Sequence, residues 1–217
     1  MIKILSFIMF LFVFLGCSFK EIPNDWQYKS ISSFDSYAKN FLSSNDVLAK
    51  SDFKRAIKHA KKSANLTTLA RIYLGKCALN ISVGLEDKCE EYKNIDVVIE
   101  DDYLSSYYNL ITLKLNKVNT SSLDDSYKNF YKSIVEKNYI QANNQIWQMK
   151  KATSKLLSAA LIKEHLNNNS REKLIKLASY YGYKKSAIFW LKESIKYTTD
   201  RKKLNKISKK LSILESQ

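Results

Sequence analysis

The chain has 217 residues and carries 36 Lys and Arg against 21 Asp and Glu, a net charge of +15. It contains one proline and four glycines, too few for the many tight turns of a sheet protein, so the composition excludes an all-β or α/β fold and indicates an all-α protein. The lysines are spread over every segment. They are either a generally basic solvated surface or a binding surface for nucleic acid, anionic lipid or an acidic polymer.

The first 16 residues have the pattern of a secretory signal peptide. Lys3 gives a positive start, and residues 4–15 are apolar except for Ser6. This apolar stretch is too short for a membrane-spanning helix, which needs about 20 residues, but it fits the apolar region of a signal peptide. We therefore expect an exported protein, and export argues against a nucleic-acid partner.

Cys17 follows Gly16 directly, which resembles the signal of a bacterial lipoprotein. The resemblance implies that Cys17 is lipidated, becomes the new N-terminus and anchors the protein to a membrane in the cell envelope. Ser18 at the next position would, by the enterobacterial sorting rule, favour the periplasmic face of the outer membrane. Ordinary secretion with cleavage nearby and an uncleaved anchor are the alternatives. Residues 17–32 are polar, lack clear periodicity and contain the only proline, so we interpret them as a tether.

Residues 33–217 are predicted to form a single all-helical domain, because apolar side chains recur at helical spacing. Phe34, Tyr37, Ala38, Phe41 and Leu42 illustrate the pattern. The run at 95–99 is strand-like but cannot form a sheet alone, so we expect a helix end or a connector there. The helices are expected at 33–42, 46–64, 66–83, 86–98, 100–117, from Thr120 through Val135, at 139–151, 155–166, 171–181 and 183–197, and after Thr198 or Thr199, with Leu204, Ile207, Leu211 and Ile213 on the buried side of the last one.

With Cys17 assigned to the lipid, Cys77 and Cys89 remain as an even pair, which in an exported protein favours a disulfide. Their spacing of twelve residues, with Gly84 between them, fits two antiparallel helices joined across their turn. Free buried thiols and a metal or redox role are the alternatives. A metal site needs about four ligands and no histidine is near in sequence, so we predict no metal and no cofactor.

Residues 182–197 resemble the second helix of a tetratricopeptide repeat, with Gly182, then Ala187, Leu191 and the pair Ser194-Ile195 at the family's spacing. Residues 52–64 follow the same phase, and Leu74-Gly75 with Ala78 resembles the family's first helix. The resemblance implies stacked antiparallel helical hairpins in an α-solenoid. The proline that ends each repeat is absent, and the 34-residue period is not kept across residues 85–165, so an irregular helical bundle is the alternative.

The sequence has no phosphate-binding glycine loop, H-E-x-x-H, C-x-x-C or G-x-S-x-G motif, and the adjacent acids at 100–102 suit a helix start. We therefore expect a protein that is not an enzyme. The favoured hypothesis is a lipid-anchored envelope scaffold that binds a partner protein in a concave groove, and the resemblance implies a role in envelope assembly. The alternative is a basic binder of anionic cell-wall polymer or lipid headgroups, through the lysines of 46–64 and of the C-terminal helices. The sequence does not predict the groove residues.

Overall fold

The computed structural model describes residues 24–216, which fold into α-helices and short 3-10 turns without a strand. The expected all-α class is therefore confirmed. The helices are α2 (Asp25–Leu42), α3 (Asp46–Ala60), α4 (Thr67–Ser82), α5 (Glu90–Asp96), α6 (Asp102–Ile111), α7 (Asp125–Val135), α8 (Tyr139–Gln148), α9 (Ala152–Leu161), α10 (Asn168–Tyr180), α11 (Lys184–Lys196) and α12 (Arg201–Glu215). The 3-10 turns are η2 (Leu115–Lys117), η3 (Thr120–Ser122) and η4 (Lys163–His165).

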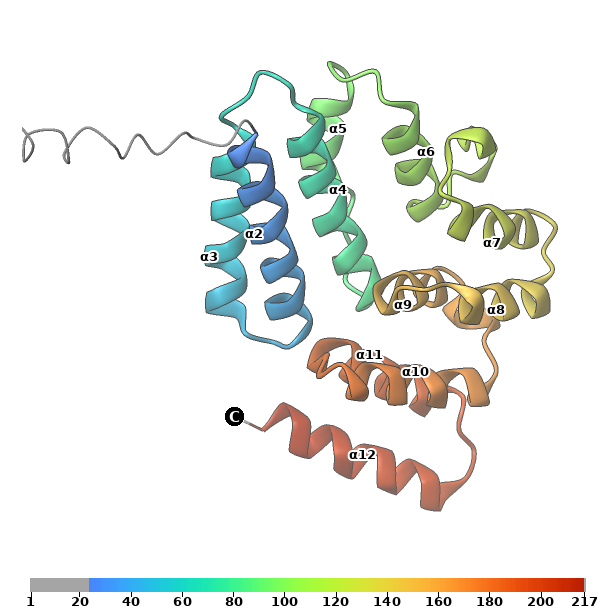
Figure 1. Ribbon diagram of the computed structural model, residues 1–217. Helices are drawn as coiled ribbons and strands as arrows, with labels where there is room; N and C mark the ends of the chain where they lie inside the picture. The colour runs from blue at the N-terminus through green and yellow to red at the C-terminus, as the bar shows by residue number, and fades with distance from the viewer. Residues whose placement is uncertain (1–23, 217) are drawn as a thin grey trace, which may run out of the picture.

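Many consecutive helices pack side by side, most extensively α2 with α3, α10 with α11 and α7 with α8 (Figure 1). In a linear helical array each hairpin contacts only its neighbours in sequence. Here α4 contacts α2, α3, α5 and α6 but also α9, and α11 contacts α2. The chain therefore folds back on its own beginning.

Helix α4 lies at the centre because it is apolar on several faces, as a helix surrounded by other helices must be. Leu69 and Ile72 pack toward α3. Leu74 belongs to a cluster that includes Leu157 of α9, and Leu79 to one with Phe41 of α2. One helix thus connects three of the apolar clusters of the molecule.

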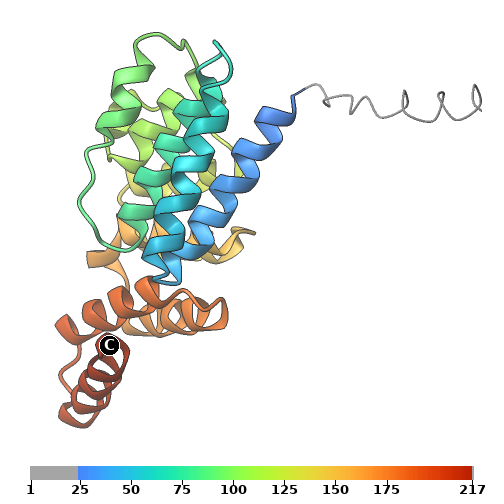
Figure 2. The same ribbon diagram turned by 90° about the vertical axis from the view of Figure 1, so that its left-hand side faces the viewer.

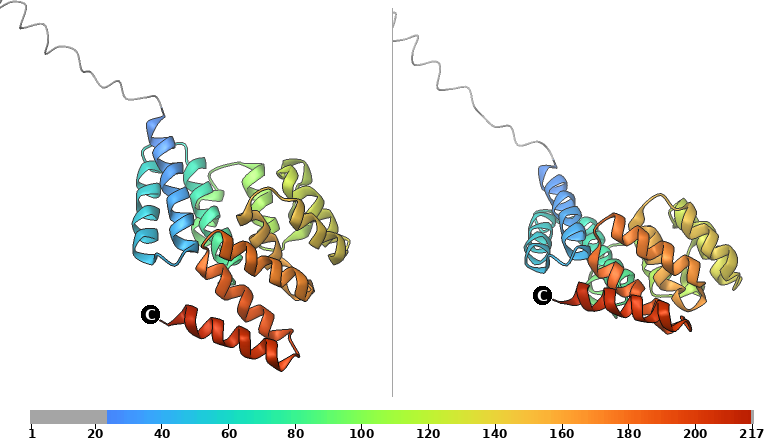
Figure 3. Two further views of the ribbon diagram at one scale, coloured as in Figure 1. Left: turned by 60° about the horizontal axis from the view of Figure 1, so that its bottom comes forward. Right: turned by 90° about the horizontal axis from the view of Figure 1, so that it is seen from below.

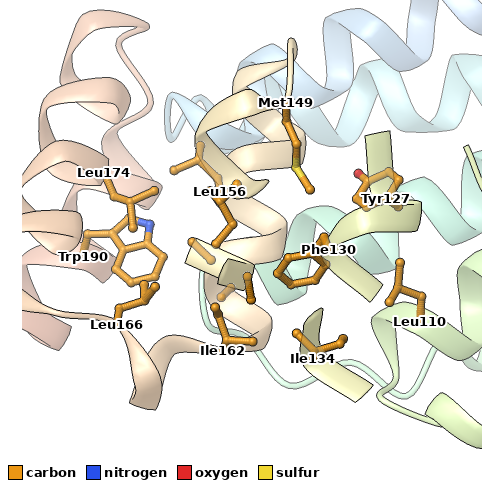
Figure 4. Packing of buried hydrophobic residues seen from close by; sticks show 14 of the residues in the cluster. Leu110, Tyr127, Phe130, Ile134, Met149, Leu156, Ile162, Leu166, Leu174 and Trp190 are labelled. Carbon is orange, nitrogen blue, oxygen red and sulfur yellow. The ribbon is translucent and has the colours of Figure 1, made fainter. Parts of the chain in front are cut away.

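The largest cluster joins the middle of the chain to the C-terminal helices (Figure 4). Phe130 of α7 and Leu156 of α9 are fully buried in it, and so is Trp190 of α11. Burial of each such side chain contributes about 1.5–3 kcal/mol, so this cluster holds α10 and α11 against the central helices. Helix α12 is attached separately, through Ile207 and Leu211, along α11 at the edge of the molecule (Figures 2 and 3).

The predicted tether, residues 17–32, is shorter than expected. Helix α2 begins at Asp25, so residues 25–32 belong to the helical body. Ser30 is buried, and its hydroxyl donates a hydrogen bond to the carbonyl oxygen of Ala56 on α3 at 2.9 Å. The small side chain of Ser30 allows α2 and α3 to approach closely. The periodicity of apolar residues does not predict such a contact.

Other expectations about the helices were also wrong. The helix expected from Thr120 begins at Asp125, after η3. The helix expected at 100–117 ends at Ile111, because Leu113 has a left-handed backbone (φ 55°) that closes the helix, and η2 and η3 follow. The last helix is capped not by Thr198 or Thr199 but by Asp200, whose carboxylate accepts from the backbone N–H of Lys202 at 2.8 Å. On that helix Ile213 is 64% exposed, and Leu214 packs in its place.

Candidate functional site

A groove of about 1350 Å³ runs between α2, α4, α6, α7 and α9. Its walls are inner faces of helices that are distant in sequence, from Phe34 of α2 to Leu157 of α9. Gly75 of α4 lies in the wall, and the ring of Phe34 lies against it. The groove exists because α9 returns to α4 and encloses a space that a linear row of helices would leave open.

Three tyrosines line one side of the groove: Tyr103 and Tyr107 of α6, and Tyr127 of α7. Tyr103 is 41% exposed, while Tyr127 is buried. The rings of Tyr107 and Tyr127 are 5.5 Å apart, and the Tyr127 hydroxyl donates a hydrogen bond to Oγ of Ser154 at 3.0 Å. The rings thus form a rigid surface graded from buried to exposed.

Burial determines the protonation of these phenols. It raises the pKa of Tyr107 well above its usual value, and it raises the pKa of Tyr127 and Tyr103 as well. For Tyr127 the hydrogen bonds with Ser154 and Tyr107 act in the opposite direction but do not offset the burial. The tyrosines are therefore neutral at physiological pH and offer ring faces and hydroxyl groups to a ligand, not charge.

Exposed charges border the groove. Arg71 of α4 and the pair Lys150-Lys151 before α9 supply positive charge. Asp124 supplies negative charge, but its carboxylate caps α7 by accepting from the N–H of Ser126 at 2.9 Å. The Ser126 hydroxyl and N–H hydrogen bonds lower the pKa of Asp124. The groove thus combines an aromatic wall with charged edges.

Cys77 and Cys89 lie at disulfide-bonding distance, as the predicted pairing requires, with Cα atoms 5.3 Å apart. The bond does not link two helix interiors. Helix α5 begins at Glu90, after the expected start at 86, and Cys89 is its N-cap residue with a left-handed backbone (φ 53°). The bond therefore joins the middle of α4 to the start of α5.

The same place brings together the one group of three potential metal ligands found among residues 24–216: the two cysteines and Asp87. Both sulfur atoms are in the disulfide. The Asp87 carboxylate accepts from Nδ2 of Asn80 at 2.6 Å and from the N–H of Cys89 at 2.7 Å. Asp87 therefore has a structural role in holding the loop before α5.

Asp101 and the two histidines are further residues whose side chains could carry chemistry, and each lies in a structural setting. Asp101 caps α6 by accepting from the N–H of Leu104 at 3.0 Å, which confirms the interpretation of the acidic run as a helix start. His165 stacks on Tyr139, with ring centroids 3.5 Å apart. The pKa of His59 is lowered by burial first and then by the nearby Lys62. Cys17 and the predicted signal peptide lie outside the described residues.

The sequence did not identify the groove. Tyr107 and Tyr127 belong to apolar stripes that read as ordinary core. Tyr103 and Tyr107 are four residues apart and therefore lie on the same side of the helix. This spacing is the one local signal that the aromatic stripe of Tyr107 continues to the surface. The gathering of these residues around α4 depends on contacts between distant helices, which no local pattern contains.

Comparison with protein-family models, with curated proteins and with solved structures finds no match to this chain. None of the helices in residues 24–216 is both long and apolar enough to cross a membrane.

Proposed function

We propose that this protein is a lipid-anchored protein of the bacterial envelope that binds a segment of a partner protein in its groove. The observation that carries the proposal is the groove between α2, α4, α6, α7 and α9 with its tyrosine wall. Its volume of about 1350 Å³ exceeds the range of about 300–1,000 Å³ that is usual for small-molecule pockets. It suits an extended peptide or a helix, whose apolar side chains would pack on the rings of Tyr103 and Tyr107.

The tetratricopeptide-like segments support this proposal. One of them, residues 182–197, begins at Gly182, whose left-handed backbone (φ 68°) closes the turn between α10 and α11. Arrays of such hairpins bind peptides on a concave face, and Tyr183 of this segment lines the groove. The partner is, on this proposal, a protein of the envelope, and binding assists its assembly.

The lipid anchor follows from Cys17 and places the binding groove at a membrane, on the periplasmic face of the outer membrane by the Ser18 sorting rule. Asn24, where the described structure begins, is seven positions after Cys17, so the connection spans at most about 25 Å. The groove would therefore stay close to the bilayer and meet partners that are in the membrane or just emerging from it.

Site-specific photocrosslinking in cells tests the groove. A photoreactive phenylalanine analogue replaces Tyr103 in the full-length chain, and in a matched control it replaces Ser208, which is exposed on α12. We expect one discrete protein adduct from position 103, absent from position 208, and weakened when Tyr107→Ala removes the neighbouring ring. Adducts of the same pattern from both positions, or none from position 103, would contradict groove binding.

The anchor is tested separately by Cys17→Ser. With a lipidated cysteine, wild-type protein fractionates with membranes and is labelled by a fatty-acid probe, and the variant loses the label. Label on the variant would refute lipidation at Cys17 and leave the groove experiment unaffected.

A further inference from the structure

Five lysines lie on the outer side of α3 and in the turn that follows it: Lys50, Lys54, Lys58, Lys61 and Lys62, which we call the α3 lysine face. All five are exposed, and no ion pair holds any of them within residues 24–216. The spacing of four between Lys50, Lys54 and Lys58 aligns them along one side of the helix. The positive charge of this face is therefore uncompensated by the protein.

The acids of α3 do not reach this face. Asp52 is buried, where it accepts from Nδ2 of Asn40 at 2.7 Å and pairs with Arg55. Asp46, at the start of the helix, pairs with Lys185 of α11 at 2.5 Å. Val47 is 84% exposed and lies eleven residues, or three turns, before Lys58 on the same side. An uninterrupted row of cations with an exposed aliphatic side chain is the pattern of a surface that rests on anionic lipid headgroups.

The position of the α3 lysine face relative to the start of the chain indicates which partner it binds. Helix α3 lies at the edge of the molecule, and it ends beside the start of α2, whereas α12 lies at the opposite end (Figure 1). The connection from Cys17 reaches at most about 25 Å, and α3 with its 15 residues is about 22 Å long. An anchor at Cys17 therefore keeps the whole α3 lysine face within reach of the bilayer.

We infer that the α3 lysine face binds the anionic headgroups of the membrane in which the protein is anchored, and so orients the groove relative to the bilayer. This inference rests on the lipid anchor proposed above. Each lysine near an anionic surface contributes about a five-fold increase in affinity.

Lysine footprinting on vesicles tests the inference without relying on lipidation in the cell. Residues 24–216 contain the described fold, so a chain beginning at Cys17 retains it, and the Cys17 thiol is coupled to a maleimide lipid while the Cys77–Cys89 bond is kept oxidised. Amine acetylation at each lysine is then measured by mass spectrometry, on vesicles of phosphatidylcholine alone and of phosphatidylcholine with 30 mol % phosphatidylglycerol (about one anionic lipid in three).

We expect acetylation of Lys54, Lys58, Lys61 and Lys62 to be about five-fold slower on the anionic vesicles, and the protection to disappear at high salt. Lys206, Lys209 and Lys210 on α12 should label equally on both vesicles. In the triple variant K50Q/K54Q/K58Q, Lys61 and Lys62 should lose their protection, whereas the matched variant K206Q/K209Q/K210Q should keep it. Equal labelling of α3 on both vesicles, or protection of α12 in its place, would overturn the inference.

Discussion

The ring of Phe34 on α2 lies so close to Gly75 on α4 that a Cβ added to Gly75 would be 2.5 Å from Cζ of the ring. Real Cβ atoms do not approach a carbon that closely, so any side chain at position 75 requires the Phe34 ring to shift. Both residues line the groove, so this contact is part of its wall.

Gly75→Ala should therefore destabilise the protein, although alanine is the better helix former by about 1 kcal/mol. We expect a net loss of about 1–3 kcal/mol in the free energy of unfolding, measured by urea titration with circular dichroism. Phe34→Leu replaces the ring by a smaller side chain. In the double variant it should therefore reduce the loss of stability that Gly75→Ala causes. Additive effects of the two substitutions would show that the ring does not restrict position 75.

How much of this fold could be predicted depends on how far apart in the sequence the interacting residues are. The periodic apolar residues of α2, α4 and α11 predict helices, and the acid at Asp101 predicts a helix start, because these signals act within a few residues. The contact of Leu157 with the cluster of Leu74 has no such signal. Neither does the pair of Lys185 with Asp46, whose partners are 139 residues apart in sequence.

The groove could not be predicted for the same reason. A helical stripe containing Tyr107 has the same spacing whether it faces a closed core or a groove, and only the return of α9 to α4 decides between them. Arg171 is the opposite case, a charged residue that the sequence suggests is exposed and that is in fact buried. In the sequence it is one more basic residue at a helix start, yet it is 2% exposed in the structure.

Reduction of the Cys77–Cys89 bond should destabilise the protein by about 3 kcal/mol, because the closed loop of twelve residues no longer restricts the unfolded chain. The urea midpoint of unfolding, measured with and without dithiothreitol, gives this difference. The double variant Cys77→Ala/Cys89→Ala should have the lower midpoint and be insensitive to the reductant. A wild-type midpoint that does not respond to reductant would show that the two thiols are unbonded.

The tyrosines of the groove predict a loss of stability at high pH. Burial raises the pKa of Tyr107 above the value of about 10 that it has in the unfolded chain. Its contribution to stability is therefore complete below pH 10 and is lost as the pH rises toward the folded-state pKa, because the unfolded chain releases the proton more readily.

The measurement is the free energy of unfolding in urea at pH 9 and at pH 11. Tyr107→Phe cannot ionise, so this variant should lose about 1 kcal/mol less than the wild type over that interval. Absorbance at 295 nm should show that tyrosinate from the groove appears together with unfolding. Equal losses in the two proteins would mean that Tyr107 ionises as easily in the fold as in the unfolded chain.

Arg171 should be the least replaceable basic residue of the C-terminal helices. Its guanidinium carbon lies 3.7 Å from the centre of the Tyr197 ring, and its Nη2 donates to the carbonyl oxygen of Lys163 at 2.9 Å. Burial lowers its pKa, and the neighbouring Tyr197 and Glu193 oppose that shift. The side chain thus links η4, before α10, to the end of α11.

Arg171→Lys keeps the charge but loses the planar stacking on Tyr197, and an ammonium group cannot reproduce the forked donors of the guanidinium. We expect a loss of about 1–3 kcal/mol in the free energy of unfolding, because a buried charge loses part of its hydrogen bonding. Arg201→Lys on α12, where the side chain is exposed, is the matched control and should change stability by less than about 0.5 kcal/mol. Equal stabilities of the two variants would show that the charge of Arg171, and not its shape, holds η4 to α11.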